Sequence, residues 1–401
     1  MNTESLTDRP VVRLKPGGRK KRPQRGSPWI FANEVAMNAA AKALPPGEIV
    51  RLETDAGEAL GAYVFNKHPL ICARRLSHDP AARIDEAFLA ERLRRAAAVR
   101  DRLIGAPYYR LVHAEADGLP GTIVDRFDDV LVLQVNTAGM DRLLPQLTAA
   151  LEATLAPRAI VLRNDSAARE LEGLSSDVRM LKGQLDGPLE LVENGTRFLA
   201  DPREGQKTGW FYDQRDNRAF AARLAQGARV LDGYCYTGGF AVQAALGGAA
   251  EVVAIDRSQP ALDLAAQSAK LNGVEERCCF VKADVFGELQ RRRDAGEAFD
   301  TVIVDPPAFV KSKKDYWQGL KGYRKLTRLA AALVARGGYL VACSCSHHVT
   351  PDDFGEQVRR GLSEVGRDGR ILRFAGAGPD HPVHPSLPET GYLKAQALAL
   401  D

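Results

Sequence analysis

Residues 229–346 repeat one pattern, in which a short apolar run ends in an acidic or sulfur-containing side chain and is followed by a turn and a helical segment. Such runs are typical of strands buried on both faces, and their alternation with helices predicts a doubly wound parallel sheet of the α/β class. The fourth run stops at Asp305-Pro306-Pro307, because two prolines cannot supply backbone donors to a sheet. Sheets of this class bind ligands at the carboxyl ends of their strands, so the residues that end each run are candidates for a binding site.

The loop after the first run, LDGYCYTGGF at residues 231–240, predicts a ligand site of a particular charge. Its glycines let the backbone approach a ligand closely, and a helix begins directly after them. The pattern is not GxGxxG, so a dinucleotide is a poor match. The carboxylate of Asp232 would repel a pyrophosphate and attract a cation. A sulfonium with an amino-acid tail is such a ligand, and we therefore expect S-adenosylmethionine.

Four successive runs end at or near an aspartate, and we assign these residues to the cofactor. We expect Asp256 to accept hydrogen bonds from both hydroxyls of a ribose, and Asp284 to contact the amino group and ring edge of adenine. The alternative is that these aspartates are N-caps of the following helices, which would account for one or two of them. The predicted cofactor contacts are Asp232, Tyr236, Gly238, Asp256, Asp284, Asp305 and Pro306.

The fifth run, residues 338–346, brings two cysteines to the same edge of the sheet. We predict that Cys345, flanked by serines where the strand ends, is a nucleophile. Addition of its thiolate to carbon 6 of a pyrimidine would make carbon 5 nucleophilic enough to accept a methyl group. Cys343 is the alternative, although a buried cysteine is usually only a small hydrophobic residue. Asp305 is the second catalytic candidate, since methyltransferases that act on an amino nitrogen or a nucleobase build the substrate pocket from Asp-Pro-Pro and an aromatic residue.

Positive charge is unevenly placed and indicates a polyanionic partner. Residues 1–30 contain eight Lys and Arg and two acidic residues. The positive excess of this segment is larger than the net charge of +4 for the whole chain. In residues 311–325, six basic residues alternate with aromatic ones, which suits phosphate contacts and base stacking. A solubilising tail and a solvated amphipathic helix are the respective alternatives. The predicted RNA contacts are Lys20, Lys21, Arg22, Lys207, Arg215, Lys311, Lys313, Lys314 and Tyr323.

Composition excludes several classes of protein. No stretch of 18 apolar residues and no apolar leader is present, so we expect a cytoplasmic protein that does not enter the membrane. The six cysteines are scattered without a CxxC pair, and we predict neither a disulfide framework nor a metal site. With 401 residues, 45% of them hydrophobic, the chain can form two or three domains.

We expect three domains along the chain. Residues 9–78 have strand patterns separated by Gly and Pro turns, and they predict a small β-rich domain. Residues 79–195 combine a helical pattern at 81–106 with several strands, as in an α+β domain. Residues 196–401 hold the doubly wound sheet.

Six segments together resemble a known family, the bacterial S-adenosylmethionine-dependent methyltransferases that form 5-methylcytosine in large-subunit (23S) ribosomal RNA. The segments are HAEADGLPGTIVDRF (113–127), KTGWFYDQR (207–215), LDGYCYTGGF (231–240), DPPAF (305–309), ACSCSHH (342–348) and HPSLPETGYLK (384–394). The resemblance implies an N-terminal PUA domain that binds RNA, a central α+β domain, and a Rossmann-like class I methyltransferase domain. It also implies that Cys345 is the nucleophile and that Asp305 orients the cytosine. The expected partner is ribosomal RNA, and a homodimer is one alternative for the oligomeric state.

Three other functions stay open or are disfavoured at this point. An enzyme with the same cofactor could methylate another base or an exocyclic nitrogen of RNA, with Asp305 acting and Cys345 inert. A non-catalytic RNA-binding factor would not need four aspartates at the strand ends. A dinucleotide oxidoreductase would need a phosphate-binding glycine motif that the sequence lacks.

Overall fold

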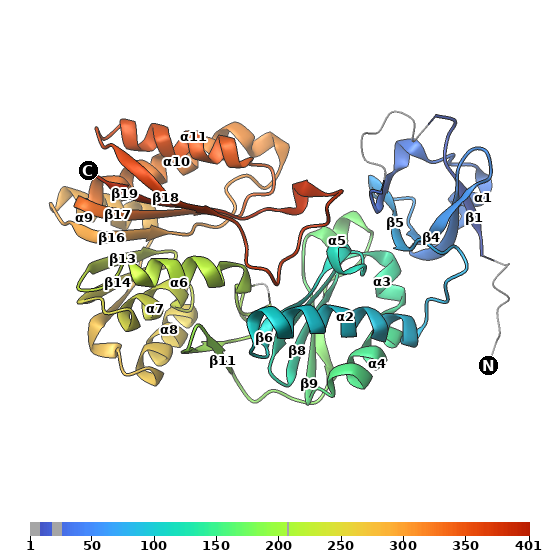
Figure 1. Ribbon diagram of the computed structural model, residues 1–401, viewed down its shortest axis with the longest axis horizontal. Helices are drawn as coiled ribbons and strands as arrows, with labels where there is room; N and C mark the ends of the chain where they lie inside the picture. Colours follow the sequence, from blue (N-terminus) through green and yellow to red (C-terminus); the bar gives the residue numbers. More distant parts are fainter. Residues whose placement is uncertain (1–8, 18–25, 207) are drawn as a thin grey trace. The chain divides into compact units, whose positions relative to one another are not determined.

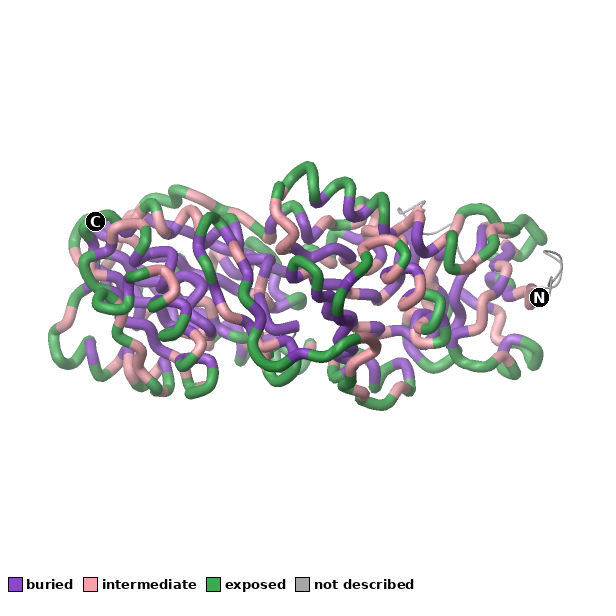
Figure 2. The backbone as a smooth tube through the Cα atoms, turned by 90° about the horizontal axis from the view of Figure 1, so that it is seen from below, coloured by how far each residue is buried: buried purple, intermediate pink, exposed green. Residues whose placement is uncertain are grey.

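The computed structural model describes residues 9–17, 26–206 and 208–401, which form two compact units. The first unit takes in the described residues up to 187 together with 202–209 and 379–388, and the rest form the second unit. Within each unit, buried residues concentrate along the strands, and exposed residues lie on the outer turns of the helices (Figure 2). Four predicted RNA contacts fall outside the described residues, namely Lys20, Lys21, Arg22 and Lys207.

The first unit begins with a five-stranded sheet of order β1-β3-β4-β5-β2. Strands β1 and β3 pair in parallel, and the other pairs are antiparallel. Apolar residues from alternate positions of the strands form its core, among them Val12, Ile30, Leu52 and Phe65. The elements are β1 (Val11–Arg13), β2 (Trp29–Phe31), α1 (Ala39–Ala43), β3 (Glu48–Glu53), β4 (Ala59–Phe65) and β5 (Ile71–Ser77).

A second five-stranded sheet in the same unit has the order β10-β9-β8-β7-β6, with β8 and β9 parallel. Helix α2 begins after Asp85, whose carboxylate accepts a hydrogen bond from the amide of Phe88 (3.1 Å), and it ends at Gly105 in the left-handed conformation (φ 71°). The elements are α2 (Glu86–Ile104), β6 (Tyr108–His113), β7 (Thr122–Phe127), β8 (Val130–Val135), α3 (Ala138–Arg142), α4 (Leu144–Leu155), β9 (Ala159–Asn164), α5 (Ala168–Leu171) and β10 (Asp177–Lys182).

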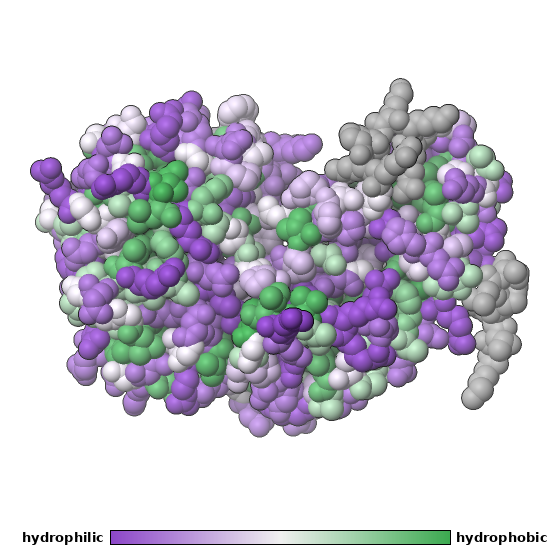
Figure 3. Space-filling model, viewed as in Figure 1, coloured by the Kyte–Doolittle hydropathy of each residue, from purple (hydrophilic) through white to green (hydrophobic). Residues whose placement is uncertain are grey.

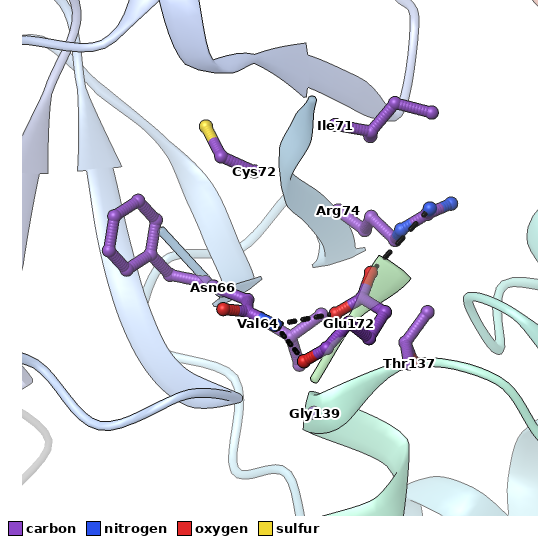
Figure 4. Close-up of a pocket in the computed structure, with 9 residues that line it drawn as sticks. Val64, Asn66, Ile71, Cys72, Arg74, Thr137, Gly139 and Glu172 are labelled. Carbon is purple, nitrogen blue, oxygen red and sulfur yellow. Dashed lines mark hydrogen bonds and ion pairs between the residues drawn. The ribbon is translucent and has the colours of Figure 1, made fainter. Parts of the chain in front are cut away.

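Contacts around Glu172 join these two sheets into one unit. The side-chain amide of Asn66 donates hydrogen bonds to Oε2 (2.8 Å) and to the carbonyl oxygen (3.0 Å) of Glu172, and Arg74 Nη2 lies 3.8 Å from its Oε1 (Figure 4). A β-carbon at Gly139 would come within 2.3 Å of the Val64 side chain, so the close approach requires glycine there. The cavity between these residues measures about 10 Å³, the space of about one water molecule.

The second unit holds a seven-stranded sheet of order β15-β14-β13-β16-β17-β19-β18. Its first five strands are parallel, and β19 runs antiparallel to both of its neighbours. Helices α10 and α11 cover one face, and α6, α7 and α8 cover the other (Figure 1). The strands are β13 (Arg229–Gly233), β14 (Glu251–Asp256), β15 (Cys278–Lys282), β16 (Phe299–Val304), β17 (Val334–Ser344), β18 (Gly369–Ala375) and β19 (Lys394–Leu400). The helices are α6 (Arg215–Arg223), α7 (Gly239–Leu246), α8 (Gln259–Leu271), α9 (Val285–Asp294), α10 (Tyr316–Leu333) and α11 (Pro351–Ser363). The predicted doubly wound parallel sheet is confirmed.

A hairpin of this unit and the residues from Trp210 onward form a buried ion-pair cluster. The hairpin consists of β11 (Leu189–Glu193) and β12 (Thr196–Ala200). The carboxylate of Glu193 is fully buried and accepts hydrogen bonds from Arg218 Nη1 (2.7 Å), Trp210 Nε1 (3.0 Å) and Gln243 Nε2 (3.3 Å). The Arg218 guanidinium also stacks over the Trp210 ring, 4.4 Å from its centroid. These contacts attach the hairpin to α6 and α7.

The units differ from the continuous domains that we predicted with a boundary after residue 195. The hairpin belongs entirely to the second unit, and residues 379–388 return to the first. They return because the Asp380 carboxylate accepts a hydrogen bond from the amide of Arg110 (3.1 Å), and its carbonyl accepts one from Arg100 (3.0 Å). Arg110 and Asp380 are 270 residues apart in the sequence, and composition cannot predict a contact between such distant residues. The separation of 9–78 from 79–195 stays a prediction.

Candidate active site at the carboxyl edge of the parallel sheet

The structure brings the predicted acidic residues to one edge of the seven-stranded sheet. Asp232 is the fourth residue of β13 and pairs in register with Ala254 and Ile303 of the neighbouring strands. Asp256 ends β14, and Asp305 follows the last residue of β16. The order of strands explains this arrangement, because carboxyl ends of parallel neighbours meet at the same edge.

The loop between β13 and α7 is held in an unusual backbone conformation. Tyr234 (φ 69°), Tyr236 (φ 50°) and Gly238 (φ 83°) all lie in the left-handed region, which is unfavourable for tyrosine. The amides of Tyr234 and Cys235 both donate hydrogen bonds to the carbonyl oxygen of Ile255 (2.9 and 3.1 Å), so the strained loop is anchored on β14. Strain of this kind persists where surrounding contacts enforce it, commonly at ligand sites.

Asp232 carries the strongest signal for a cationic ligand. Its side chain is fully buried, and neither carboxylate oxygen has a hydrogen-bond partner among the described residues. Burial, and then the charge of Asp305, raise the pKa of Asp232 to about 8, while the Ala241 amide and Arg218 act in the opposite direction. A buried carboxylate without donors is unfavourable unless a ligand supplies them. These residues therefore fit the positively charged amino-acid end of S-adenosylmethionine.

Asp256 is positioned by the backbone and keeps acceptor capacity. Its Oδ2 accepts a hydrogen bond from the amide of Tyr236 (3.0 Å), and its Oδ1 accepts one from the amide of Ser258 (2.9 Å). Each carboxylate oxygen has a second lone pair, so the two oxygens can still accept hydrogen bonds from two hydroxyls. This geometry fits the predicted contact with a ribose.

At Asp284 the alternative interpretation holds, because this residue is the N-cap of α9. Its Oδ2 accepts a hydrogen bond from the amide of Gly287 (3.0 Å), and its Oδ1 pairs with Arg257. The Gly287 amide, and then Arg257, lower the pKa of the Asp284 carboxyl. A contact between Asp284 and adenine stays a prediction.

The two cysteines at the end of β17 lie in different environments. Cys343 is fully buried, and burial together with the charge of Asp305 raises its thiol pKa well above the ordinary value. Cys345 comes directly after the strand and is only half-buried. Its Sγ lies 3.8 Å from the carbonyl oxygen of Pro306, which puts the thiol against the Asp-Pro-Pro segment. A reactive thiol must be accessible and able to ionise, so this environment favours Cys345 over Cys343.

Lys394 is a further residue of this site, and the sequence reasoning missed it. It begins β19 opposite Ser344, and its buried ammonium group donates hydrogen bonds to the carbonyl oxygens of Ser346 (2.6 Å) and Tyr392 (2.7 Å). Burial lowers the pKa of Lys394 to about 8, and the negative charge of ionised Cys345 raises it in part. By reciprocity, the ammonium group stabilises the Cys345 thiolate. The one available signal was a single lysine within the apolar tail of residues 392–400.

The prediction that Tyr323 contacts RNA is wrong, because its side chain is buried in the core. Its hydroxyl lies 2.7 Å from Ser346 Oγ and accepts a hydrogen bond from the amide of Phe309 (3.4 Å). Ser346 Oγ also accepts a hydrogen bond from the amide of Val310 (3.1 Å). Tyr323 and Ser346 therefore fix the DPPAF segment against the cysteine segment.

The remaining predicted RNA contacts divide by exposure. Arg215 is buried, with its guanidinium over the Tyr212 ring at 5.4 Å, so the prediction that it contacts RNA is also wrong. The side chain points inward because residues 210–215 pack within the second unit. Trp317 is 74% exposed at the start of α10. Three lysines just before that helix are exposed as predicted, namely Lys311, Lys313 and Lys314.

The described residues contain neither a metal-binding cluster nor a membrane-spanning helix. Within residues 9–17, 26–206 and 208–401, no group of three or more His, Cys, Asp or Glu side chains is placed to hold a metal ion. None of the helices in these ranges is both long and apolar enough to span a bilayer.

Comparison with known proteins identifies the class of fold and the cofactor. The family of S-adenosylmethionine-dependent methyltransferases matches residues 116–395, and the PUA-like domain matches residues 12–78. A protein from Streptococcus mutans, proposed to be a SAM-dependent methyltransferase, has the same fold (TM-score 0.81, 21% identity, 97% of this chain and 100% of that chain). A second structure, of a proposed methyltransferase complexed with SAH, is equally similar (TM-score 0.81, 20% identity, 97% and 99%). The fold and the acidic edge therefore define a class I S-adenosylmethionine-dependent methyltransferase with an N-terminal PUA-like domain.

Curated relatives narrow the family further. The ribosomal RNA large subunit methyltransferase I of Cronobacter sakazakii is 39% identical over 385 residues, which cover 95% of this chain and 97% of that protein. The protein of the same name from Aeromonas hydrophila is 39% identical over 383 residues, covering 94% and 96%. The chain belongs to the ribosomal RNA large subunit methyltransferase I family. The predicted fold class and cofactor are confirmed, whereas the roles of individual site residues stay predictions.

Proposed function

We propose that this protein methylates carbon 5 of a cytosine in large-subunit ribosomal RNA through a covalent intermediate on Cys345. The observation that carries the proposal is the position of Cys345, a half-buried thiol 3.8 Å from the Pro306 carbonyl oxygen with the buried ammonium of Lys394 beside it. Relatives at 38–39% identity carry the name ribosomal RNA large subunit methyltransferase I, which supports this RNA as the substrate.

The reaction begins when the Cys345 thiolate forms a bond from Sγ to carbon 6 of the cytosine. The electron pair of the 5,6 double bond moves to carbon 5. S-adenosylmethionine, when bound, would supply a methyl group on a sulfonium. Carbon 5 forms a bond to this methyl group with that electron pair, while the methyl–sulfur bond breaks and its electrons stay on sulfur, which leaves as a neutral thioether. A base then removes the hydrogen of carbon 5 as a proton, the double bond re-forms, and the thiolate leaves. Lys394 stabilises the thiolate at the first and last of these steps.

The other residues at the edge bind and orient. Asp232 and Asp256 hold the two ends of the cofactor, and Asp305 orients the exocyclic amino group of the cytosine. The target base must leave its stack to reach Cys345, which costs roughly a few kcal/mol. Contacts of the PUA-like domain and of the lysines before α10 with flanking RNA offset this cost. We assign residues 9–78 to RNA binding, 79–195 to spacing, and 196–401 to catalysis.

RNA that contains 5-fluorocytosine tests the proposal. Fluorine cannot leave carbon 5 as a proton does, so a covalent complex should accumulate with wild-type protein and S-adenosylmethionine. It should appear as a shifted band that resists denaturation. The complex should be absent with Cys345→Ala and should form with Cys343→Ala, the matched control. If wild type methylates ordinary RNA without trapping the fluorinated one, the cysteine mechanism is wrong and the acceptor is a nitrogen.

A further inference from the structure

A basic cavity in the first unit lies outside the edge that holds Cys345. It has a volume of about 340 Å³. Its walls come from the sheet that contains β5, from α2, from the turn after β6 and from segment 379–388. Of the residues that the structure describes, five basic side chains line it, namely Arg75, His78, Arg92, Arg95 and His384. On the face of the molecule seen in Figure 3, strongly hydrophilic side chains gather over α2.

The acidic residues of this cavity are already paired elsewhere. Glu115 Oε1 accepts hydrogen bonds from Arg74 Nη1 (2.6 Å) and from Trp29 Nε1 (2.8 Å). Asp117 accepts a bidentate pair of hydrogen bonds from Arg100 (2.6 and 2.8 Å) and a third from the amide of His113 (2.6 Å). Their charges are therefore balanced by Arg74 and Arg100, which do not line the cavity.

Arg95 is paired with Glu91 (2.7 Å), but the other two arginines that line the cavity, Arg75 and Arg92, lack this compensation. Among the described residues, Arg75 donates a hydrogen bond to the carbonyl oxygen of Gly26 (3.1 Å) and Arg92 donates one to that of Leu76 (3.2 Å), and no ion pair joins either arginine to a carboxylate. Burial, and then the charges of Arg95 and Arg75, lower the pKa of Arg92. The guanidinium groups of Arg75 and Arg92, which have no carboxylate partner in the described part of the chain and repel each other, form a site that an anion would stabilise.

Local structure builds this cluster. A β-carbon at Gly118, which has φ +72°, would lie 2.8 Å from Arg92 Nη1, so glycine is what lets the guanidinium lie across the turn. The segment HAEADGLPG (113–121) contains Glu115, Asp117 and Gly118. It has no role in the proposed methyl-transfer site. Apart from the two histidines, no aromatic side chain is among the described residues that line the cavity, so it is suited to charge rather than to a stacked base.

We propose that this cavity binds a phosphate of the RNA backbone and so fixes the position of the substrate on the first unit. The anion is identified as RNA because of the proposed function, and the inference rests on it to that extent. Phosphate contacts position a nucleic acid without reading its sequence, and Arg is the side chain best suited to make them.

The test measures binding of the full chain to a transcript of large-subunit ribosomal RNA between about 50 and about 200 mM salt. Arg75→Gln, Arg92→Gln and Arg95→Gln should each reduce the slope of log affinity against log salt by about 1, and Arg92→Lys should restore it. The matched control is Arg102→Gln, an exposed arginine of the same helix outside the cavity, which should leave the slope unchanged. The Arg95 side chain is 69% exposed, so that variant will fold.

Unchanged slopes in all three variants, with wild type binding RNA, would overturn the cavity assignment and leave the proposed function intact. A wild type that does not bind the transcript would overturn both. A second experiment measures the binding of inorganic phosphate to the full chain. Saturable phosphate binding that Arg92→Gln abolishes, without any change in RNA binding, would reassign the cavity to a free phosphate compound.

Discussion

The ammonium group of Lys394 donates a hydrogen bond to the carbonyl oxygen of Ser346 (2.6 Å), the residue directly after Cys345. The lysine at the start of β19 and the half-buried Cys345 directly after β17 thus lie near each other, because the two strands pair antiparallel with Lys394 opposite Ser344. The ammonium group is held by two carbonyl oxygens and interacts electrostatically with Cys345, so we assign Lys394 as a positioning residue in the proposed reaction.

Replacing Lys394 with Met should make Cys345 less reactive. Loss of the ammonium should move the midpoint of Cys345 alkylation upward by roughly one pH unit, since a nearby opposite charge shifts a pKa by that order. The measurement is the iodoacetamide reaction of Cys345 followed by mass spectrometry across pH. Lys394→Arg should keep the wild-type midpoint. Because the pKa of Lys394 is lowered to about 8, its support should fade above about pH 8 in wild type but not in Lys394→Arg. Identical profiles in all three proteins would contradict the assignment.

Asp232→Asn should stabilise the cofactor-free protein at neutral pH and weaken cofactor binding. The pKa of Asp232 is raised from 3.8 to about 8 on folding, so between these values the folded state binds a proton that the unfolded state lacks. Stability therefore falls as pH rises through this window, and the asparagine variant should lose that dependence. Thermal unfolding at several pH values and calorimetric titration with S-adenosylmethionine check both outcomes. A variant less stable than wild type near pH 8 would refute the prediction.

Trp317→Ala should weaken RNA binding without affecting the fold. The ring is 74% exposed beside three exposed lysines, and stacking of one base on an aromatic side chain contributes about 1–3 kcal/mol. We expect the dissociation constant for the ribosomal RNA transcript to rise by about tenfold, with the melting temperature unchanged. Tyr323→Phe is the contrasting variant. Removing its buried hydroxyl should lower stability by about 1 kcal/mol and leave RNA affinity the same. The reverse pattern would mean that the two aromatic residues have been assigned wrongly.

Glu193→Gln should destabilise the second unit strongly. The variant leaves the buried guanidinium of Arg218 without its carboxylate, which typically costs about 3–5 kcal/mol. Urea unfolding of the full chain measures the effect. The control is Glu190→Gln in the same hairpin, where the exposed pair with Arg197 contributes at most about 1 kcal/mol. Equal losses from the two variants would show that burial of Glu193 is not what matters.

Local sequence was sufficient for the strands and loops that carry the cofactor site. The apolar runs before Asp232, Asp256 and Asp305 are strands, and the glycine loop after the first run adopts left-handed backbone conformations. Asp284 shows the limit of such patterns, since an N-cap and a ligand contact require the same residue at the same place.

The sequence could not show which side chains point into the core and which point to solvent. Tyr323 and Arg215 are of residue types that are common on RNA-binding surfaces, but both are buried. Trp317, on the same helix as Tyr323, is exposed to solvent. Residues 394–400 were not predicted to form a strand. The pairing register that places Lys394 near Cys345 could therefore not be predicted. That register depends on hydrogen bonds between segments about fifty residues apart.

The sequence by itself therefore determined the class of fold, the cofactor and the edge of the sheet that holds the candidate site, because periodicity, prolines and glycines act within a few residues. Tertiary structure alone decided which thiol is accessible, which lysine supports it, and which arginines meet in the cavity of the first unit. These depend on burial and on pairing between distant segments, and both arise only when the chain is packed.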